Sequence, residues 1–195
     1  SELFSGDPSE APQDENTRMN SQSPYGTSKL FAHQICKNYR EGYGMFICCG
    51  ILFNHESKRR GDNFVTKKII NAIPKGEVSL GNLDASRDWG YAPEMIEGMW
   101  LMLQQDKPDN YVVGSGTTHS IRELCEIAFG HGGLNYQDYV VQDQKFFRPA
   151  EVDLLVADPG RAHKELGWQP KVGFENLVMM MVDADIKRLE NNSPT

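Results

Sequence analysis

The chain has 195 residues, of which 39% are hydrophobic and 24% are charged, and its formal net charge is −7. This composition is typical of a soluble globular protein with one large core or one and a half domains. A membrane span is excluded because no run of about 18 apolar residues occurs, and the acidic balance argues against nucleic acid as a partner. The start at Ser1 has neither a signal-peptide pattern nor an initiating methionine, so we expect the chain to begin inside a larger protein.

The four cysteines, Cys36, Cys48, Cys49 and Cys125, do not have the spacing of metal ligands. Three of them lie within apolar helix or strand patterns. We therefore interpret them as buried thiols of a protein in the reducing cytoplasm, without a disulfide framework and without a metal site.

The first long element is a helix predicted over residues 24–43. Residues 5–22 before it are rich in Ser, Pro, Asp, Glu and Asn, which indicates a surface loop. Ser23 suits the N-cap and Pro24 the first helical position, and the glycines at 42 and 44 suit the helix end. The apolar face of this helix is predicted to consist of Leu30, Phe31, Ile35 and Tyr39.

An unbroken apolar run at 45–53 follows and predicts a central parallel strand that is covered on both faces. A helix followed by a buried strand indicates an α/β sheet. Ligands of such sheets bind beyond the carboxyl ends of the strands, which puts the expected site at residues 54–61. Further helices are predicted over 63–73, 93–104, 120–129, 158–167 and 174–189, and short strands over 78–80, 111–113 and 139–141.

Two of these helices have a clear apolar stripe. In helix 63–73 the apolar residues are predicted to face inward, and Lys67 and Lys68 to face solvent. In helix 93–104 the stripe is interpreted as core packing rather than as a cofactor site. It consists of Met95, Ile96, Met99, Trp100 and Leu103.

Tyr25 and Lys29 are four residues apart at the start of the first helix, so they lie on the same helix face. A nearby ammonium group favours the phenolate form of a tyrosine, and such a tyrosine can act as a general base or acid toward a hydroxyl group. Taken alone, the pair is more simply interpreted as an ordinary helix start, with Tyr25 packed and Lys29 solvated.

Several short polar segments, in this order along the chain, together resemble the GDP-mannose 4,6-dehydratases of the extended short-chain dehydrogenase/reductase superfamily. The Tyr-x-x-x-Lys pair is common to that superfamily, whereas Asn-His-Glu-Ser and Arg-Asp-Trp-Gly are more particular to the dehydratases. The segments are Ser1-Glu2-Leu3-Phe4, Ser23-Pro24-Tyr25-Gly26 with Lys29, residues 50–57 with Arg59-Arg60-Gly61, residues 80–84 with Arg87-Asp88-Trp89-Gly90, and residues 148–153.

The resemblance implies an α/β fold that contains the C-terminal part of a Rossmann-type parallel sheet and a smaller α/β substrate-binding domain. Residues 1–60 would belong to the dinucleotide-binding domain and residues 61–190 to the nucleotide-sugar-binding region, with 191–195 as a tail. Helix 93–104 could instead pack back on the first region. The implied reaction is the NADP-dependent dehydration of GDP-mannose to GDP-4-keto-6-deoxy-mannose, in which the C4 hydride passes to the cofactor and returns to C6.

The resemblance also implies roles for individual residues. Tyr25 would take the proton of the sugar 4-hydroxyl, Lys29 would hold the nicotinamide ribose, and Glu2 would remove the C5 proton. His55 and Arg60 would contact the cofactor together with Tyr25 and Lys29, and the Arg59-Arg60 loop would reach a neighbouring subunit of a homo-oligomer, dimer or tetramer. The residues expected to bind the nucleotide sugar are Asn54, Arg87, Arg148 and Glu151, the two arginines through the pyrophosphate.

The Gly-rich loop of the family is missing from this sequence, as is the hydroxyl residue that should precede Ser1. Without those glycines nothing in the sequence binds the cofactor pyrophosphate, so we expect this chain to be catalytically incomplete by itself. Two alternatives stay open: another nucleotide-sugar epimerase or dehydratase of the superfamily, and a non-catalytic module that binds nucleotide sugars or assists assembly. The sequence does not decide between NADP and NAD.

Overall fold

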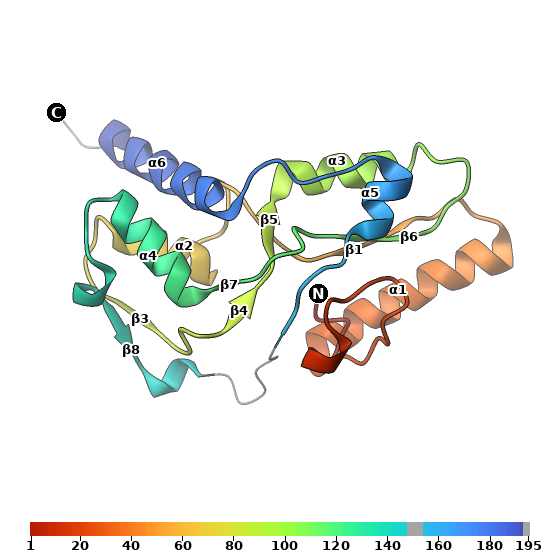
Figure 1. Ribbon diagram of the computed structural model, residues 1–195, viewed down its shortest axis with the longest axis horizontal. Coiled ribbons are helices and arrows are strands. Elements are labelled where there is room, and N and C mark those ends of the chain that lie inside the picture. The colour runs from red at the N-terminus through yellow and green to blue at the C-terminus, as the bar shows by residue number, and fades with distance from the viewer. Residues whose placement is uncertain (148–153, 193–195) are drawn as a thin grey trace. The chain divides into compact units, whose positions relative to one another are not determined.

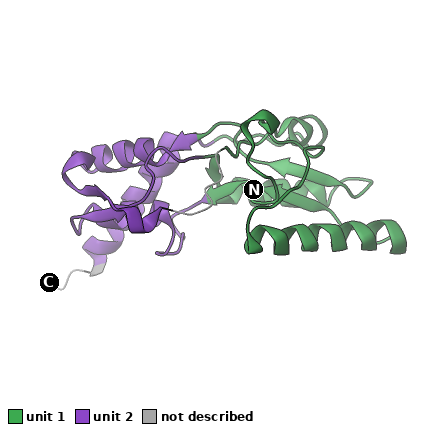
Figure 2. Cartoon of the chain, turned by 90° about the horizontal axis from the view of Figure 1, so that it is seen from below, with its two compact units in different colours: residues 1–55, 87–118, 152–171 green, residues 56–86, 119–151, 172–195 purple. Residues whose placement is uncertain are grey.

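The structure is a computed structural model that describes residues 1–147 and 154–192. Its α/β architecture agrees with the predicted fold class, and the chain forms two compact units (Figure 2). Unit 1 consists of residues 1–55, 87–118 and 152–171, and unit 2 of residues 56–86, 119–151 and 172–195. The predicted region 61–190 thus contains residues of both units, and helix 93–104 lies in unit 1 with most of the first region.

Helix α1 (Pro24–Tyr43) has the bounds that its capping residues predicted. The Ser23 hydroxyl oxygen accepts a hydrogen bond of 3.0 Å from the Gly26 N–H, which satisfies one of the free donors at the helix N-terminus. Pro24 occupies the first turn, and Gly44 ends the helix with a left-handed conformation at φ 65°, which glycine adopts without steric cost.

Only Gly26 is buried among the 20 residues of α1. A Cβ atom at this position would lie 2.2 Å from both the carbonyl oxygen of Glu2 and the hydroxyl oxygen of Ser21, so the helix start packs directly on the backbone of Glu2. Leu30 packs against the core of unit 1. The prediction for the other apolar residues of α1 was wrong, because Phe31, Ile35 and Tyr39 are exposed.

The sheet of unit 1 pairs strand β1 (Cys49–Leu52) in parallel with β6 (Asn110–Val113), with Gly50 opposite Tyr111. The predicted strand 45–53 was too long, since Met45 and Phe46 precede β1 and are exposed. Successive strand residues alternate between two cores, one on each face. One core contains Leu3, Phe4, Ile51, Phe53, Val112, Leu155 and Ala157, and the other Met95, Met102, Tyr111, Val113, Ala162, Leu166 and Trp168.

Helices α3 (Ala92–Met102) and α5 (Gly160–Leu166) contribute to the second of these cores, on the face of the sheet opposite α1 (Figure 1). Trp168, which follows α5, donates a hydrogen bond of 2.7 Å to the carbonyl of Glu94 in α3. The predicted core stripe of α3 was correct only for Met95. Its remaining members, Ile96, Met99, Trp100 and Leu103, are exposed.

The rest of unit 1 surrounds this sheet. Strand β2 (Asn54–Glu56) pairs with β5 (Trp89–Tyr91). The short β4 (Ser86–Arg87) precedes β5 where the chain enters unit 1. A single 3-10 turn, η1 (Pro8–Glu10), lies in the N-terminal loop.

The described part of unit 2 contains three α-helices and a parallel pair of strands. Helices α2 (Val65–Ala72), α4 (Ile121–His131) and α6 (Phe174–Asn192) contact one another, and α2 also contacts β3. Strand β3 (Val78–Leu80) pairs with β8 (Val140–Gln142), and Val78 lies opposite Val140. The remaining elements of the unit are β7 (His119–Ser120), η2 (Tyr136–Asp138) and η3 (Gln144–Phe146).

Lys67 of α2 is buried, contrary to the prediction that it faces solvent. Its ammonium group contacts both carboxylate oxygens of Asp185 in α6 at 2.5 Å, and Asp185 is buried as well. A buried ammonium group is tolerated when a carboxylate pairs with it. The pair therefore joins α2 to α6 in the interior of unit 2.

A second buried carboxylate, Glu56, lies at the start of unit 2. It accepts a hydrogen bond of 2.9 Å from the Thr66 hydroxyl and pairs with Arg60, whose Nε lies 3.1 Å from its Oε2. The Arg60 guanidinium in turn lies 3.5 Å from the centre of the Phe64 ring. Burial raises the pKa of Glu56 to about 7, although the charge of Arg60 and the Thr66 hydrogen bond both act to lower it.

The raised pKa of Glu56 predicts a dependence of stability on pH. Because the folded-state pKa of about 7 exceeds the ordinary value of 4.5, the stabilising contribution is fully present below about pH 4.5 and is lost as the pH rises through about 7. Glu56→Gln keeps an acceptor for Thr66 but cannot ionise. Its free energy of unfolding should rise relative to the unmodified chain by on the order of 3 kcal/mol across this range, as measured by urea denaturation at several pH values.

The exposed Glu126 provides the control for this measurement, since Glu126→Gln should follow the unmodified chain at every pH. If the free energies of unfolding of Glu56→Gln and the unmodified chain change in parallel with pH, the raised pKa of Glu56 is contradicted.

Two glycines of α1 provide a matched test of the helix packing. Gly26→Ala would force a methyl group onto the Glu2 carbonyl and should destabilise the chain by at least ~2 kcal/mol. At Gly42, in the same helix, an added Cβ atom would have no neighbour within 4 Å, so Gly42→Ala should stabilise the chain by ~0.5–1 kcal/mol. Urea unfolding of both variants checks the difference, and equal effects would rule out the close packing of Gly26.

Candidate active site

The start of α1 presents a phenol and an ammonium group together. The Lys29 Nζ lies 5.4 Å from the centre of the Tyr25 ring, because the two residues are one turn apart on the same helix face. Tyr25 is 60% exposed and Lys29 is exposed as well. The two side chains are therefore near each other and accessible to a ligand, rather than packed in the core.

The carboxylate of Glu2 lies at the same helix N-terminus. Its Oε2 accepts a hydrogen bond of 2.7 Å from the hydroxyl of Ser23, the residue that also caps α1. Negative charge at this end of a helix is favoured by the helix dipole. The sequence predicted Ser23 only as a cap, and the structure adds a second contact, which fixes the Glu2 side chain relative to Tyr25.

Arg87 is half-buried at the end of the short strand β4 and directly precedes the buried Asp88. Asp88 belongs to the Arg-Asp-Trp-Gly segment, but the sequence assigned it no role of its own. It is fully buried, and its Oδ1 accepts hydrogen bonds from the Ser115 N–H and hydroxyl at 2.8 and 2.7 Å. Its Oδ2 accepts from the N–H groups of Gly116 and Ala157 at 2.9 and 3.0 Å. Asp88 thus joins the segment of Arg87 to the turn after β6 and to the segment around Ala157.

Asn54 and His55 follow β1, where the sequence placed the expected site, and both are half-buried. The Phe53 carbonyl lies 2.9 Å from Nδ1 of His55. Because a carbonyl can only accept, Nδ1 carries the proton of the neutral ring and Nε2 is the acceptor.

The other predicted site residues fall elsewhere. Arg60 is in unit 2 and contacts Glu56 and Phe64 as described above. Arg148 and Glu151 lie outside the described residues. Within residues 1–147 and 154–192 no group of three or more His, Cys, Asp or Glu side chains is arranged to hold a metal ion, and no helix is long and apolar enough to cross a membrane.

The geometry of unit 1 supports acid–base chemistry on an alcohol. A phenol beside an ammonium group can exchange a proton with a hydroxyl, and a carboxylate can take a proton from carbon. Glu2, Tyr25 and Lys29 provide these three groups within one turn of the same helix start.

Comparison with known proteins identifies the family to which the chain is similar. The family model "GDP-mannose 4,6 dehydratase" matches residues 1–181. GDP-mannose 4,6 dehydratase 2 of Arabidopsis thaliana is 54% identical over 193 residues, which is 96% of this chain and 51% of the relative. The human GDP-mannose 4,6 dehydratase is 45% identical over 215 residues, which is 98% of this chain and 58% of the relative. The chain thus spans about half the length of the curated relatives that it matches.

Solved structures share the fold. RMD from Pseudomonas aeruginosa, complexed with NADPH, has a TM-score of 0.81 at 22% identity, over 91% of this chain and 60% of that chain. The dTDP-glucose 4,6-dehydratase of Bacillus anthracis, in complex with NAD, has a TM-score of 0.81 at 20% identity, over 90% and 56%. With the family model matching most of the sequence, the chain belongs to the GDP-mannose 4,6-dehydratase family.

Proposed function

We propose that this chain carries the catalytic and nucleotide-sugar-binding residues of a GDP-mannose 4,6-dehydratase that converts GDP-mannose to GDP-4-keto-6-deoxy-mannose. The observation that carries the proposal is the position of the Glu2 carboxylate, which is hydrogen-bonded to Ser23 at the start of the helix that bears Tyr25 and Lys29. The two relatives described above bear the name of this activity.

Tyr25 and Glu2 transfer protons in the proposal, and Lys29 assists them. Tyr25, next to the Lys29 ammonium, accepts the proton of the sugar 4-hydroxyl. A ketone at C4 makes the C5 proton acidic, and Glu2 removes it. Protonation of the departing 6-hydroxyl then releases water. Lys29 also binds the hydroxyl groups of the cofactor ribose.

The residues present fit one end of a nicotinamide dinucleotide. Tyr25 and Lys29 are exposed and offer a phenol and a cationic donor, and His55 offers Nε2 as an acceptor. When bound, the dinucleotide supplies the acceptor and donor of hydride. We assign NADP rather than NAD by the family resemblance, with Arg60 as a further contact. This chain contributes binding, orientation and proton transfer.

GDP-mannose is the proposed substrate, and a sugar diphosphate requires cationic forks. Arg87 is the described residue that we propose for this role, because the next residue, Asp88, joins its segment to the turn after β6 in unit 1. By the resemblance, Arg148 is proposed as the second arginine, Glu151 as a contact to ribose hydroxyls, and Asn54 as a contact to the sugar or phosphates.

The proposal also covers the assembly and the cellular location of the enzyme. A homo-oligomer, dimer or tetramer, would form through the loop of Arg59 and Arg60, both of which are at least partly exposed. The four cysteines are free thiols, which suits the cytoplasm. Because the chain spans about half of its relatives, we propose that it needs the remaining part of the dehydratase for turnover.

The second candidate is an epimerase of the same superfamily. Among the solved structures that resemble the chain is a UDP-N-acetylglucosamine 4-epimerase from Methanobrevibacter ruminantium, with a TM-score of 0.83 at 25% identity over 96% of this chain and 61% of that chain. An epimerase does not require Glu2 for elimination, so the role of Glu2 separates the two candidates.

Calorimetric titration of the purified chain with GDP-mannose and with NADP tests the binding part of the proposal. GDP-mannose should bind, and Arg87→Met should weaken its binding by about tenfold or more, which corresponds to ~1.4 kcal/mol. Arg188→Met, at an exposed site in unit 2, serves as the control and should leave the affinity unchanged. If neither ligand binds, only an assembly role is left for the isolated chain.

Two variants test the chemistry after the chain is joined to the remaining part of the Arabidopsis relative. Tyr25→Phe should reduce turnover by ~10²–10⁴-fold because the 4-hydroxyl proton has no acceptor. Glu2→Gln should still reduce the cofactor in a single turnover but should lose both exchange of the C5 proton with deuterated solvent and release of water. Normal water release by Glu2→Gln would contradict the role of Glu2.

A further inference from the structure

Two cysteines of unit 1 lie on elements that pack against each other. Cys36 belongs to α1 and Cys49 to β1. Both are free thiols, and Cys36 is half-buried whereas Cys49 is buried. The proposed function gives neither of them a role, although their places along the helix and the strand bring the two side chains together.

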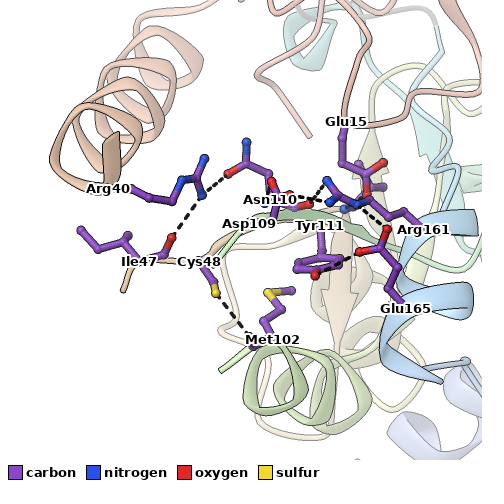
Figure 3. A network of polar contacts seen from close by, with 11 residues as sticks. Glu15, Arg40, Ile47, Cys48, Met102, Asp109, Asn110, Tyr111, Arg161 and Glu165 are labelled. Atoms are coloured by element: carbon purple, nitrogen blue, oxygen red, sulfur yellow. Dashed lines mark hydrogen bonds and ion pairs between the residues drawn. The ribbon is translucent and has the colours of Figure 1, made fainter. Parts of the chain in front are cut away.

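Cys49 points to the side of the sheet that α1 covers. Side chains along a strand alternate between its two faces, so Cys49 shares its face with Ile51. Ile51 belongs to the core against which Leu30 of α1 packs. The neighbouring Cys48 points to the other core, where its thiol donates a hydrogen bond of 3.3 Å to the carbonyl of Met102 in α3 (Figure 3). The two adjacent cysteines therefore face opposite sides of the sheet.

Cys36 lies on the inner face of α1. In a helix with one covered face, the covered positions recur every three or four residues. Between residues 30 and 40 the half-buried positions follow this pattern, and the positions between them are exposed. Gly26, the buried residue at the start of α1, continues the same face. The half-buried positions are 30, 33, 36, 37 and 40.

Arg40 fixes the alignment of α1 with β1. It donates hydrogen bonds of 3.1 Å to the Ile47 carbonyl and of 3.0 Å to the Asn110 side chain (Figure 3), and the earlier turns of α1 lie over the later residues of β1. Helix and strand therefore run in opposite directions. Cys36 precedes Arg40 by one turn, about 6 Å, which corresponds to about two residues of a strand. It consequently lies opposite Cys49, which follows Ile47 by two residues and is the register partner of Asn110.

The two thiols differ in reactivity. Burial, together with the charge of Cys36 and a hydrogen bond between the two side chains, raises the pKa of the Cys49 thiol to about 11, whereas Arg40 acts to lower it. The hydrogen bond agrees with the alignment of α1 and β1. Cys49 is therefore protonated at neutral pH and is not the sulfur that attacks first. Cys36 is half-buried, so a small oxidant can reach it from solvent.

We propose that Cys36 and Cys49 form a dithiol that hydroperoxides oxidise to a disulfide, which joins α1 to β1. With hydrogen peroxide, the Cys36 sulfur attacks one oxygen, the O–O bond breaks, and the thiol proton leaves with the other oxygen as water. The Cys49 sulfur then attacks the sulfur of the Cys36 sulfenic acid, and the hydroxyl group departs as water with the Cys49 proton. The two thiols lose two electrons and two protons, and the peroxide is reduced to two molecules of water.

Such a bond suits a transient modification better than a permanent one. In a reducing compartment, dithiols reverse a disulfide by exchange. The modified helix also bears Tyr25 and Lys29, but the inference does not rest on the proposed activity, because it uses only the contact between α1 and β1.

The test is to treat the full, reduced 195-residue chain with hydrogen peroxide, alkylate the remaining thiols, and analyse an unreduced tryptic digest by mass spectrometry. The number of free thiols should fall from four to two. Peptide 30–37, which contains Cys36, should be found joined to peptide 41–58, which contains Cys49, in a product lighter by two hydrogen atoms than the two peptides together. Treatment with dithiothreitol should restore both separate peptides.

Variants identify the second sulfur, because Cys48 and Cys49 lie in the same tryptic peptide. Cys49→Ala should abolish the cross-link and allow dimedone to trap the sulfenic acid on Cys36. Cys48→Ala is the matched control at the neighbouring position and should form the cross-link as the unmodified chain does. The inference is overturned if the unmodified chain forms no cross-link, if the cross-link joins two chains, if it persists in Cys49→Ala, or if Cys48→Ala abolishes it.

Discussion

The close approach between Glu2 and Gly26 determines the arrangement of the candidate site. A helix can rest directly on another backbone only where it has no side chain, and Gly26 provides that place at the first turn of α1. The same contact positions the Glu2 side chain for its hydrogen bond to Ser23 and leaves Tyr25 and Lys29 exposed. The site thus depends on a residue that has no chemistry of its own.

The elements with local signals could be predicted from the sequence, and those that depend on distant partners could not. Ser23, Pro24 and Gly44 encode the bounds of α1 through its own caps. The prediction that Lys67 faces solvent was wrong because its carboxylate partner is 118 residues away in the sequence. The stripes of α1 and α3 have helical periodicity, but periodicity does not reveal whether the covering surface belongs to the same chain. Phe31 of α1 and Trp100 of α3 have this periodicity and are nevertheless exposed.

Of the contacts in the candidate site, the sequence predicts some and not others. Tyr25 and Lys29 meet through helical spacing alone, whereas the contact of Glu2 with Ser23 needs the fold of the N-terminal loop. Asp88 lies in the Arg-Asp-Trp-Gly segment, but its bonding role carries no sequence signal because three of its four donors are backbone N–H groups, which every residue except proline has. A residue that joins loops by accepting hydrogen bonds from backbone N–H groups can be identified only from the three-dimensional structure.

The buried pair of Lys67 and Asp185 has a consequence for synthesis on the ribosome. Lys67 is synthesised 118 residues before its counter-charge, so its ammonium group would stay without a carboxylate partner until α6 has been made. Unit 2 should consequently reach its native interior only after α6 has emerged. Premature termination before residue 185 would yield a product that lacks this pairing and is exposed to proteolysis.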